Sequence, residues 1–231
     1  IRDFCLSRGL GDLYKRQKKD FMVTDAFKLP LDVKVLGVYP HAHYLGKDMQ
    51  GYATLPGGRR QWLIRIKDWD LNWQAVFRYA RPISLPKGSV ITMRWTYDNS
   101  KHNPRNPSHP ARRVRGGNKS TDEMAHLWVQ VLPAKRDDLK VLQAALMRHR
   151  LRRSPGDFVA HTNLGAVLQA MGELPEAVEH FRAAVQANPD AVAARNNLGG
   201  ALLELGRPAE ALPHLSAAVR LQPHHANVRY N

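Results

Sequence analysis

The sequence contains a single cysteine, Cys5, among its 231 residues. One thiol excludes an intramolecular disulfide and a CxxC-type zinc site, so any metal site must use His, Met or carboxylate ligands. No apolar run approaches the roughly 18 residues of a membrane-spanning helix. Because 43% of the residues are hydrophobic, we expect a folded chain rather than a disordered one.

Acidic residues are also few, because 20 Asp and Glu stand against 35 Lys and Arg, which gives a net charge of +15. Residues 1–154 carry 30 basic and 13 acidic side chains (+17), and residues 155–231 carry 5 and 7 (−2). Two clusters stand out, one in a loop and one on a helix: Arg112, Arg113, Arg115 and Lys119, and Arg148, Arg150, Arg152 and Arg153. Neither cluster interleaves aromatic residues as single-strand nucleic-acid sites do. We therefore interpret both as solvated faces and do not expect nucleic acid as a partner.

We expect that neither end of the chain is a natural terminus. It begins at Ile1 rather than Met and ends at Asn231 inside a helical pattern, so we expect a fragment. Residues 7–17, SRGLGDLYKRQ, differ only at Leu13 from the translation of a common sequencing adapter. We interpret residues 1–17 as a non-native leader and set them aside from fold prediction, the alternative being an ordinary leader segment.

Residues 20–134 show short β-rich runs separated by turn sequences such as LPGGRR, LPKG and NPRNP. No 3.6-residue period persists there, so the pattern predicts an antiparallel β-sandwich of jelly-roll-like type. Trp62, Trp69 and Trp73 are expected in its core or at its edge.

An α-helical pattern follows. Residues 135–154 predict a linker helix that begins at Asp137 or Asp138 and ends at Ser154. Residues 155–188 then match residues 189–222 at an offset of 34 residues, and a third copy begins at Pro223. The spacing of small, large and Pro positions resembles the tetratricopeptide repeat, which predicts a helical solenoid that binds a protein or peptide.

Two histidines, His41 and His43, stand in the run LGVYPHAHYLGKD. On a strand, this spacing directs both imidazoles to one face, where they could bind one metal ion or hydrogen-bond within a pocket. His102 and His109 lie in a loop of stacked turns, and only a loop folded over the site would bring them close.

The combination of HxHxLGK with STDEM at residues 120–124 resembles the C-terminal, catalytic half of the copper type II ascorbate-dependent monooxygenases. The resemblance covers about residues 28–133 and implies that His41, His43 and Met124 are catalytic copper ligands. Two imidazoles and a thioether suit copper, and the thioether favours Cu(I). The resemblance further implies hydroxylation of a C–H bond in an organic substrate with O2, an external reductant such as ascorbate, and export to the periplasm or cell exterior.

Several positions depart from the family pattern. The peptide-processing members have an arginine where Tyr39 stands, which argues against a peptide acid as substrate. Substrate-contacting positions after the methionine are occupied by His126 and Trp128, which would share a strand face with Met124. His126 could line a pocket, add a ligand or be a core histidine, and Asp122 and Glu123 could orient ligands or polarise a strand end.

We therefore expect a copper monooxygenase-like enzyme fused to tetratricopeptide repeats. The second, electron-supplying copper domain of the family is not in this sequence, so we expect the fragment to be inactive alone. The alternative is a non-catalytic interaction scaffold whose β domain has degenerated.

Overall fold

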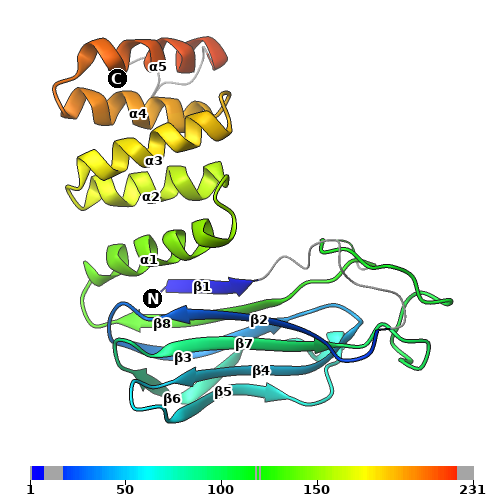
Figure 1. Ribbon diagram of the computed structural model, residues 1–231. Coiled ribbons are helices and arrows are strands. Elements are labelled where there is room, and N and C mark those ends of the chain that lie inside the picture. Colours follow the sequence, from blue (N-terminus) through cyan, green and yellow to red (C-terminus); the bar gives the residue numbers. More distant parts are fainter. Residues whose placement is uncertain (1, 8–17, 118, 120, 223–231) are drawn as a thin grey trace. The chain divides into compact units, whose positions relative to one another are not determined.

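The computed structural model describes residues 2–7, 18–117, 119 and 121–222 of the chain. It separates into two compact units, residues 1–136 and residues 137–231. The first consists of β-strands and the second of α-helices, which confirms the predicted fold class (Figure 1). Most of the suspected leader (residues 8–17) and the start of the third repeat (residues 223–231) lie outside the described residues. None of the described helices has the length and apolar character that a membrane crossing requires.

The β unit is a sandwich of two four-stranded sheets, and every strand pair described within them is antiparallel. The first sheet has the order β1 (Arg2–Ser7), β8 (His126–Pro133), β3 (Val33–His41) and β6 (Phe77–Leu85). The second has the order β2 (Phe21–Lys28), β7 (Val90–Tyr97), β4 (Gly46–Thr54) and β5 (Arg60–Ile66). Alternate residues point inward, and the fully buried side chains include Val35, Met49, Ile91, Met93, Trp95 and Val129.

Strand β1 comes from the segment interpreted above as a leader. It pairs with β8 along its whole length. Phe4 and Leu6 are buried, and the Phe4 ring packs against Phe27 of β2 with 5.6 Å between the ring centroids. Phe4 and Leu6 therefore contribute to the core of the sandwich. The resemblance to an adapter begins only at Ser7, and its residues 8–17 are not described.

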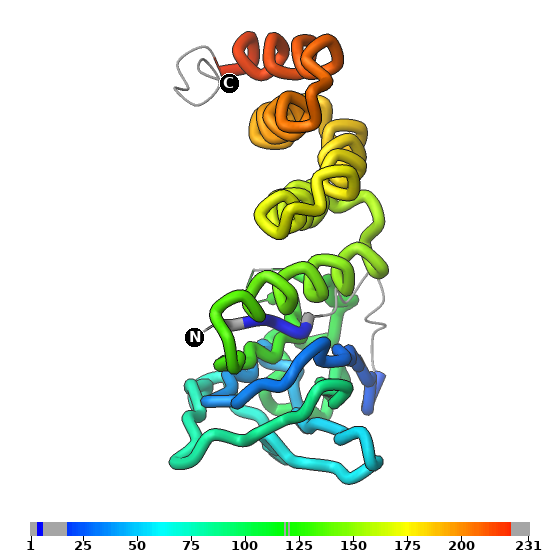
Figure 2. Tube along the Cα trace, turned by 90° about the vertical axis from the view of Figure 1, so that its left-hand side faces the viewer, coloured from blue at the N-terminus to red at the C-terminus, as the bar shows by residue number. Residues whose placement is uncertain are grey.

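The second unit contains five described helices: α1 (Asp138–Arg153), α2 (Phe158–Ala170), α3 (Leu174–Ala187), α4 (Val192–Glu204) and α5 (Pro208–Leu221). They follow one another as antiparallel hairpins, visible along the helical part of Figure 2. Helix α1, predicted as a linker, contributes Ala144 to the same core as Leu164 and Phe181.

The 34-residue offset recurs in the contacts of the helices. Gly165 of α2 lies so close to Phe181 of α3 that a Cβ would come within 2.6 Å of the ring, and Gly199 meets Leu215 in the same way. Ion pairs repeat as well, with Arg148 to Glu176 at 2.7 Å and Arg182 to Glu210 at 2.9 Å. The two copies therefore share both their packing and their surface contacts, as tetratricopeptide repeats do.

Candidate functional site

The predicted site residues gather at one end of the first sheet. His41 is the last residue of β3 and pairs with His126, the first residue of β8. Tyr39 and Trp128 form another pair of the same ladder. Because residues 127, 129 and 131 are buried and residue 128 is exposed, His126 and Trp128 lie on the outer face of the sheet.

The prediction that both histidines lie on a strand is wrong for His43. Strand β3 ends at His41, and His43 stands in the turn that leads into β4 at Gly46. The turn nevertheless keeps the two rings together, with 5.1 Å between their centroids and an angle of 86° between their planes. The pair therefore converges through the turn rather than through strand periodicity. Met124 similarly precedes β8 instead of lying within it.

Hydrogen bonds fix which nitrogen of each imidazole is available. Nδ1 of His43 lies 2.9 Å from the backbone oxygen of Asp122. Nδ1 of His41 contacts the side-chain oxygen of Gln74, just after the short helix η1 (Leu71–Trp73). Both oxygens can only accept, so each Nδ1 carries the hydrogen. In each ring Nε2 then presents a lone pair, the usual arrangement of metal-binding histidines.

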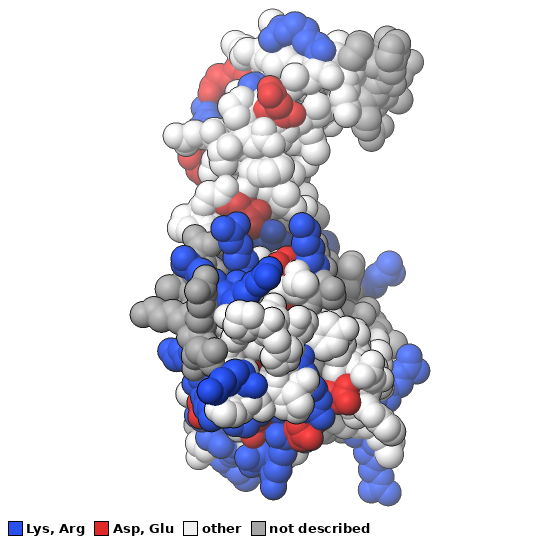
Figure 3. Space-filling view, turned by 90° about the vertical axis from the view of Figure 1, so that its right-hand side faces the viewer, with Lys and Arg blue, Asp and Glu red and all other residues white. Residues whose placement is uncertain are grey.

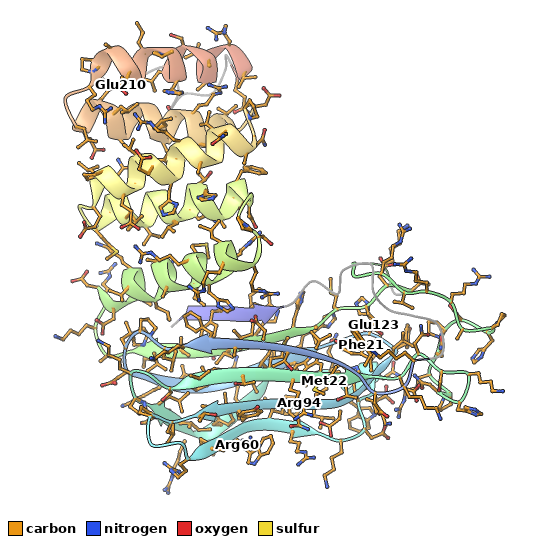
Figure 4. The ribbon with its side chains drawn as sticks, viewed as in Figure 1. Phe21, Met22, Arg60, Arg94, Glu123 and Glu210 are labelled. Atoms are coloured by element: carbon orange, nitrogen blue, oxygen red, sulfur yellow. The ribbon has the colours of Figure 1, made fainter. Side chains whose placement is uncertain are left out.

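Glu123 connects the segment of His43 with that of Met124. Its carboxylate accepts hydrogen bonds from the backbone N–H groups of His43 (2.9 Å), Leu45 (2.6 Å) and Met124 (3.3 Å). The residue is 1% exposed. Burial raises the pKa of Glu123 to about 7. The three N–H donors act in the opposite direction and lower this pKa, but the effect of burial is larger. Figure 4 places Glu123 at the end of the sandwich where the long loops gather.

Two buried tryptophans hold the backbone of the histidine segment. The indole N–H of Trp95 donates to the carbonyl of His41 at 3.2 Å, and that of Trp69 donates to the carbonyl of His43 at 3.1 Å. Trp69 thus lies in the core, as predicted, whereas Trp73 is 80% exposed in η1 and does not fill the core. The position of His43 therefore depends on the packed interior as well as on the turn.

Asp122 acts through its backbone rather than through its carboxylate. The Asp122 carbonyl accepts from His43, while the side chain accepts from the N–H of Lys119 at 3.2 Å. The Met124 carbonyl accepts from the hydroxyl of the buried Tyr97. These contacts set the course of the chain through residues 122–124.

His41 and His126 favour the neutral state. Burial lowers the pKa of His41; the hydrogen bond to Gln74 raises it, and His43 lowers it further. Burial also lowers the pKa of His126, as do the neighbouring His41 and His43. Neutral imidazole is the form that binds a metal ion.

His126 lies beside His41, with ring centroids 6.0 Å apart, and Tyr39 stacks on His41 with its centroid at 6.2 Å. His102 and His109 are not among the ring contacts described for His41. They belong to the predicted stacked turns, in which side chains such as Asp98 and Asn103 accept from backbone N–H groups two residues on.

Sequence reasoning missed Gln74 and the two tryptophan contacts. Gln74 is far from the histidines in sequence, and it stands in a short segment without a motif. Arg105 pairs with Asp68 (2.6 Å) and Asp70 (4.0 Å), which supports the start of η1. These ion pairs join segments that are distant in the sequence, so only the fold reveals them.

The donor set suits a soft or borderline metal ion. In the described part of the chain, no three His, Cys, Asp or Glu side chains converge as a metal cluster. Met124 follows Glu123 directly, and the Glu123 carboxylate binds the backbone N–H groups of both His43 and Met124. Two imidazoles with a thioether fit copper.

The β-sandwich and its paired imidazoles define the class of the protein: a β domain with a candidate metal site, joined to helical repeats. A family model described as the C-terminal domain of copper type II ascorbate-dependent monooxygenases matches residues 22–144. Since this is more than half of the chain, the protein belongs to that family. A second model, described as a tetratricopeptide repeat, matches residues 162–226.

Several solved structures match part of this chain. A point mutant of MamA is 26% identical, with a TM-score of 0.35, over 37% of this chain and 62% of that one. The Arabidopsis OM64 TPR domain is 16% identical, with a TM-score of 0.39, over 40% of this chain and 76% of that one. The TPR2B domain of yeast Sti1, in a complex with pHsp70, is 23% identical, with a TM-score of 0.36, over 39% and 72%. The chain thus spans less than two thirds of the MamA mutant. No curated protein sequence matches it.

Proposed function

We propose that the β unit is the copper-binding half of a monooxygenase, with Nε2 of His41, Nε2 of His43 and the sulfur of Met124 as ligands. The observation that carries the proposal is the pair of Nδ1 hydrogen bonds, to Gln74 and to the Asp122 carbonyl, which leaves both Nε2 atoms as acceptors. Copper bound there would supply the redox chemistry by which O2 hydroxylates a C–H bond.

The residues around the ligands have distinct roles in this proposal. Glu123 holds the His43 turn and Met124 in one arrangement, since its carboxylate binds N–H groups from both. Tyr39 and Trp128 flank the histidines on the outer face of the sheet, where an organic substrate could lie against their rings. The absence of an arginine at position 39 makes a peptide acid a poor substrate.

We further propose that the helical unit binds a protein or peptide partner. Stacked repeats bury a shared core and present extended surfaces, the usual basis of recognition by such modules. Its formal charge from residue 155 onward is slightly negative, so the positive charge of the chain is not a property of the repeats.

Copper titration tests the main proposal. We expect the purified chain to bind about one equivalent of copper, detected by elemental analysis and by Cu(I) competition. His43→Ala should abolish binding, and Met124→Leu should weaken Cu(I) more than Cu(II), because only Cu(I) prefers the thioether. His102→Ala is the matched control and should bind as the unaltered chain does. Failure of the unaltered chain to bind copper would leave the interaction scaffold as the function.

A further inference from the structure

The outer face of the second sheet carries an ordered set of cations. Because residues opposite one another in a ladder share a face, the register fixes which side chains point outward. Arg94 of β7 and Arg65 of β5 both pair with Gln50 of β4, and Thr54 pairs with Arg60. We call this surface the basic sheet face; its cationic side chains, all exposed, are Lys28, Arg60, Arg65 and Arg94.

Aromatic rings support two of these arginines. The guanidinium of Arg60 lies over the Tyr52 ring at 4.2 Å and 5.6 Å from the Trp62 centroid, and that of Arg65 lies 5.5 Å from Trp62. The two rings contact each other edge to face at 5.5 Å. Stacking of this kind restricts a guanidinium while leaving its N–H edges free to bind an anion.

The face has an uncompensated positive charge. Asp48 is the carboxylate among its described outward positions, and it lies 3.7 Å from Arg65. Four cations against one carboxylate leave a formal charge of +3. Strands β7 and β5 flank β4, so the backbones of Arg94 and Arg65 stand about 10 Å apart. Figure 4 shows Arg94 and Arg60 along this sheet, with Met22 on β2 beside Arg94.

We propose that the basic sheet face binds a linear acidic polysaccharide, whose carboxylate or sulfate groups pair with the arginines. Guanidinium groups bind such planar or multi-oxygen anions through paired hydrogen bonds. The cations are spread over three strands, so an extended polymer with repeated charges matches them better than a single small anion does. This site is independent of the copper ligands.

The arrangement of the rings disfavours nucleic acid. Single strands are bound through open aromatic faces on which bases stack, whereas the Tyr52 face is occupied by Arg60. Duplex DNA is read by elements that enter a groove, and a flat sheet face offers none. In this surface the aromatic rings serve to orient the arginines.

Affinity measurements with a defined heparin decasaccharide and an oligothymidylate of similar charge test this proposal. At about 50 mM salt we expect the decasaccharide to bind the unaltered chain, and Arg60→Ala with Arg65→Ala to weaken it by about tenfold or more. Arg112→Ala with Arg115→Ala removes the same charge elsewhere and should reduce binding by less than about threefold. Arg60→Lys with Arg65→Lys keeps the charge but removes the guanidinium groups that stack on the rings. We therefore expect this variant to retain most of the loss of decasaccharide affinity. Circular dichroism establishes that each variant is folded.

Several results would overturn the proposal. They are a lack of binding by the unaltered chain, equal losses in the two alanine pairs, full affinity in the lysine variant, or tighter binding of the oligothymidylate. Copper content should be the same in all these variants, so failure here is separable from failure of the proposed metal site.

Discussion

His41 and His126 face each other across the β3–β8 ladder, with their ring centroids 6.0 Å apart. The first belongs to the pair whose Nε2 atoms are available, whereas the second begins the strand that follows Met124. Burial lowers the pKa of His126, and the proximity of His41 lowers it further, because a positive charge on one ring would raise the energy of a charge on the other. The same proximity makes His126 a position to test as an additional ligand of the proposed copper ion.

We predict that His126 is a neighbour rather than a ligand. His126→Ala should retain about one equivalent of copper with affinity changed by no more than about threefold, because no three histidines converge on one point in the described part of the chain. His41→Ala, the matched change across the ladder, should lose copper. Copper analysis and electron paramagnetic resonance of Cu(II) measure both. Loss of nitrogen hyperfine structure in His126→Ala would assign it as a ligand instead.

Gln74→Leu should weaken copper binding by about 10- to 100-fold, because the Nδ1–H of His41 loses its acceptor and the ring loses its orientation. Asn72→Ala, two residues earlier on the exposed side of η1, should have little effect. Competition with a Cu(I) chelator gives the two affinities. Equal affinities would show that Gln74 does not orient the ligand.

Glu123→Ala should destabilise the fold by about 2–4 kcal/mol, since three backbone N–H groups lose their acceptor. Asp122→Ala should cost less than about 1 kcal/mol, because His43 contacts the Asp122 carbonyl and not its side chain. Urea unfolding of the metal-free chain, followed by tryptophan fluorescence, compares the two. The reverse order would contradict the assigned roles.

Two glycines in the repeats should respond oppositely to alanine. Gly165→Ala places a Cβ within 2.6 Å of the buried Phe181 ring and should cost about 1–3 kcal/mol. Gly200→Ala meets nothing within 4 Å and should stabilise helix α4 by up to about 1 kcal/mol. Thermal unfolding followed by helical circular dichroism measures the difference. Similar effects of both changes would refute the close approach of α2 and α3.

The helical unit should lose stability on mild acidification. Nδ1 of His161 lies 2.9 Å from Nδ1 of His180, and burial lowers the pKa of His180, with a further lowering by His161. A folded-state pKa below the unfolded value of 6.5 means that the unfolded chain binds the proton first. Stability is therefore full above pH 6.5 and falls as the pH drops below it.

His180→Gln should flatten this dependence between about pH 7.5 and pH 5.5, because the group that takes up the proton is removed. The facing Glu176 also contacts Arg148, which lowers its pKa, so its carboxylate titrates below this window. Thermal unfolding midpoints across the pH range measure both chains. Parallel curves would show that His180 contributes nothing.

Local sequence patterns predicted the architecture, because strands, helices and repeats each have a characteristic residue spacing. Turn sequences divided the β half, and the 34-residue offset marked the repeats, whose packing recurs at Gly165 and Gly199. The site was harder to derive. Residue spacing suggested that His41 and His43 share a strand face, but the turn after β3 sets their geometry, and Gln74 approaches from a segment that no motif marks.

The sequence and the structure also differ in where they place the basic surface. In Figure 3, basic side chains predominate over acidic ones on the visible face of the β unit. The clusters visible in the sequence are those around Arg112 and Arg148. Arg60, Arg65 and Arg94 are separated along the chain, and only strand pairing brings them onto one sheet face. Linear proximity therefore indicated a different surface from the one that the sheet register assembles.

The hydrogen bonds of Glu123 also limit which sequence changes this fold can tolerate. Because the carboxylate binds the peptide N–H groups of His43 and Leu45, it is sensitive to the length of the chain between them and indifferent to most side chains there. Substitutions at position 44 can therefore accumulate without disturbing the proposed ligands. One inserted residue would displace an N–H group and separate the histidine turn from Met124, so evolution of this loop should proceed by replacement and not by insertion.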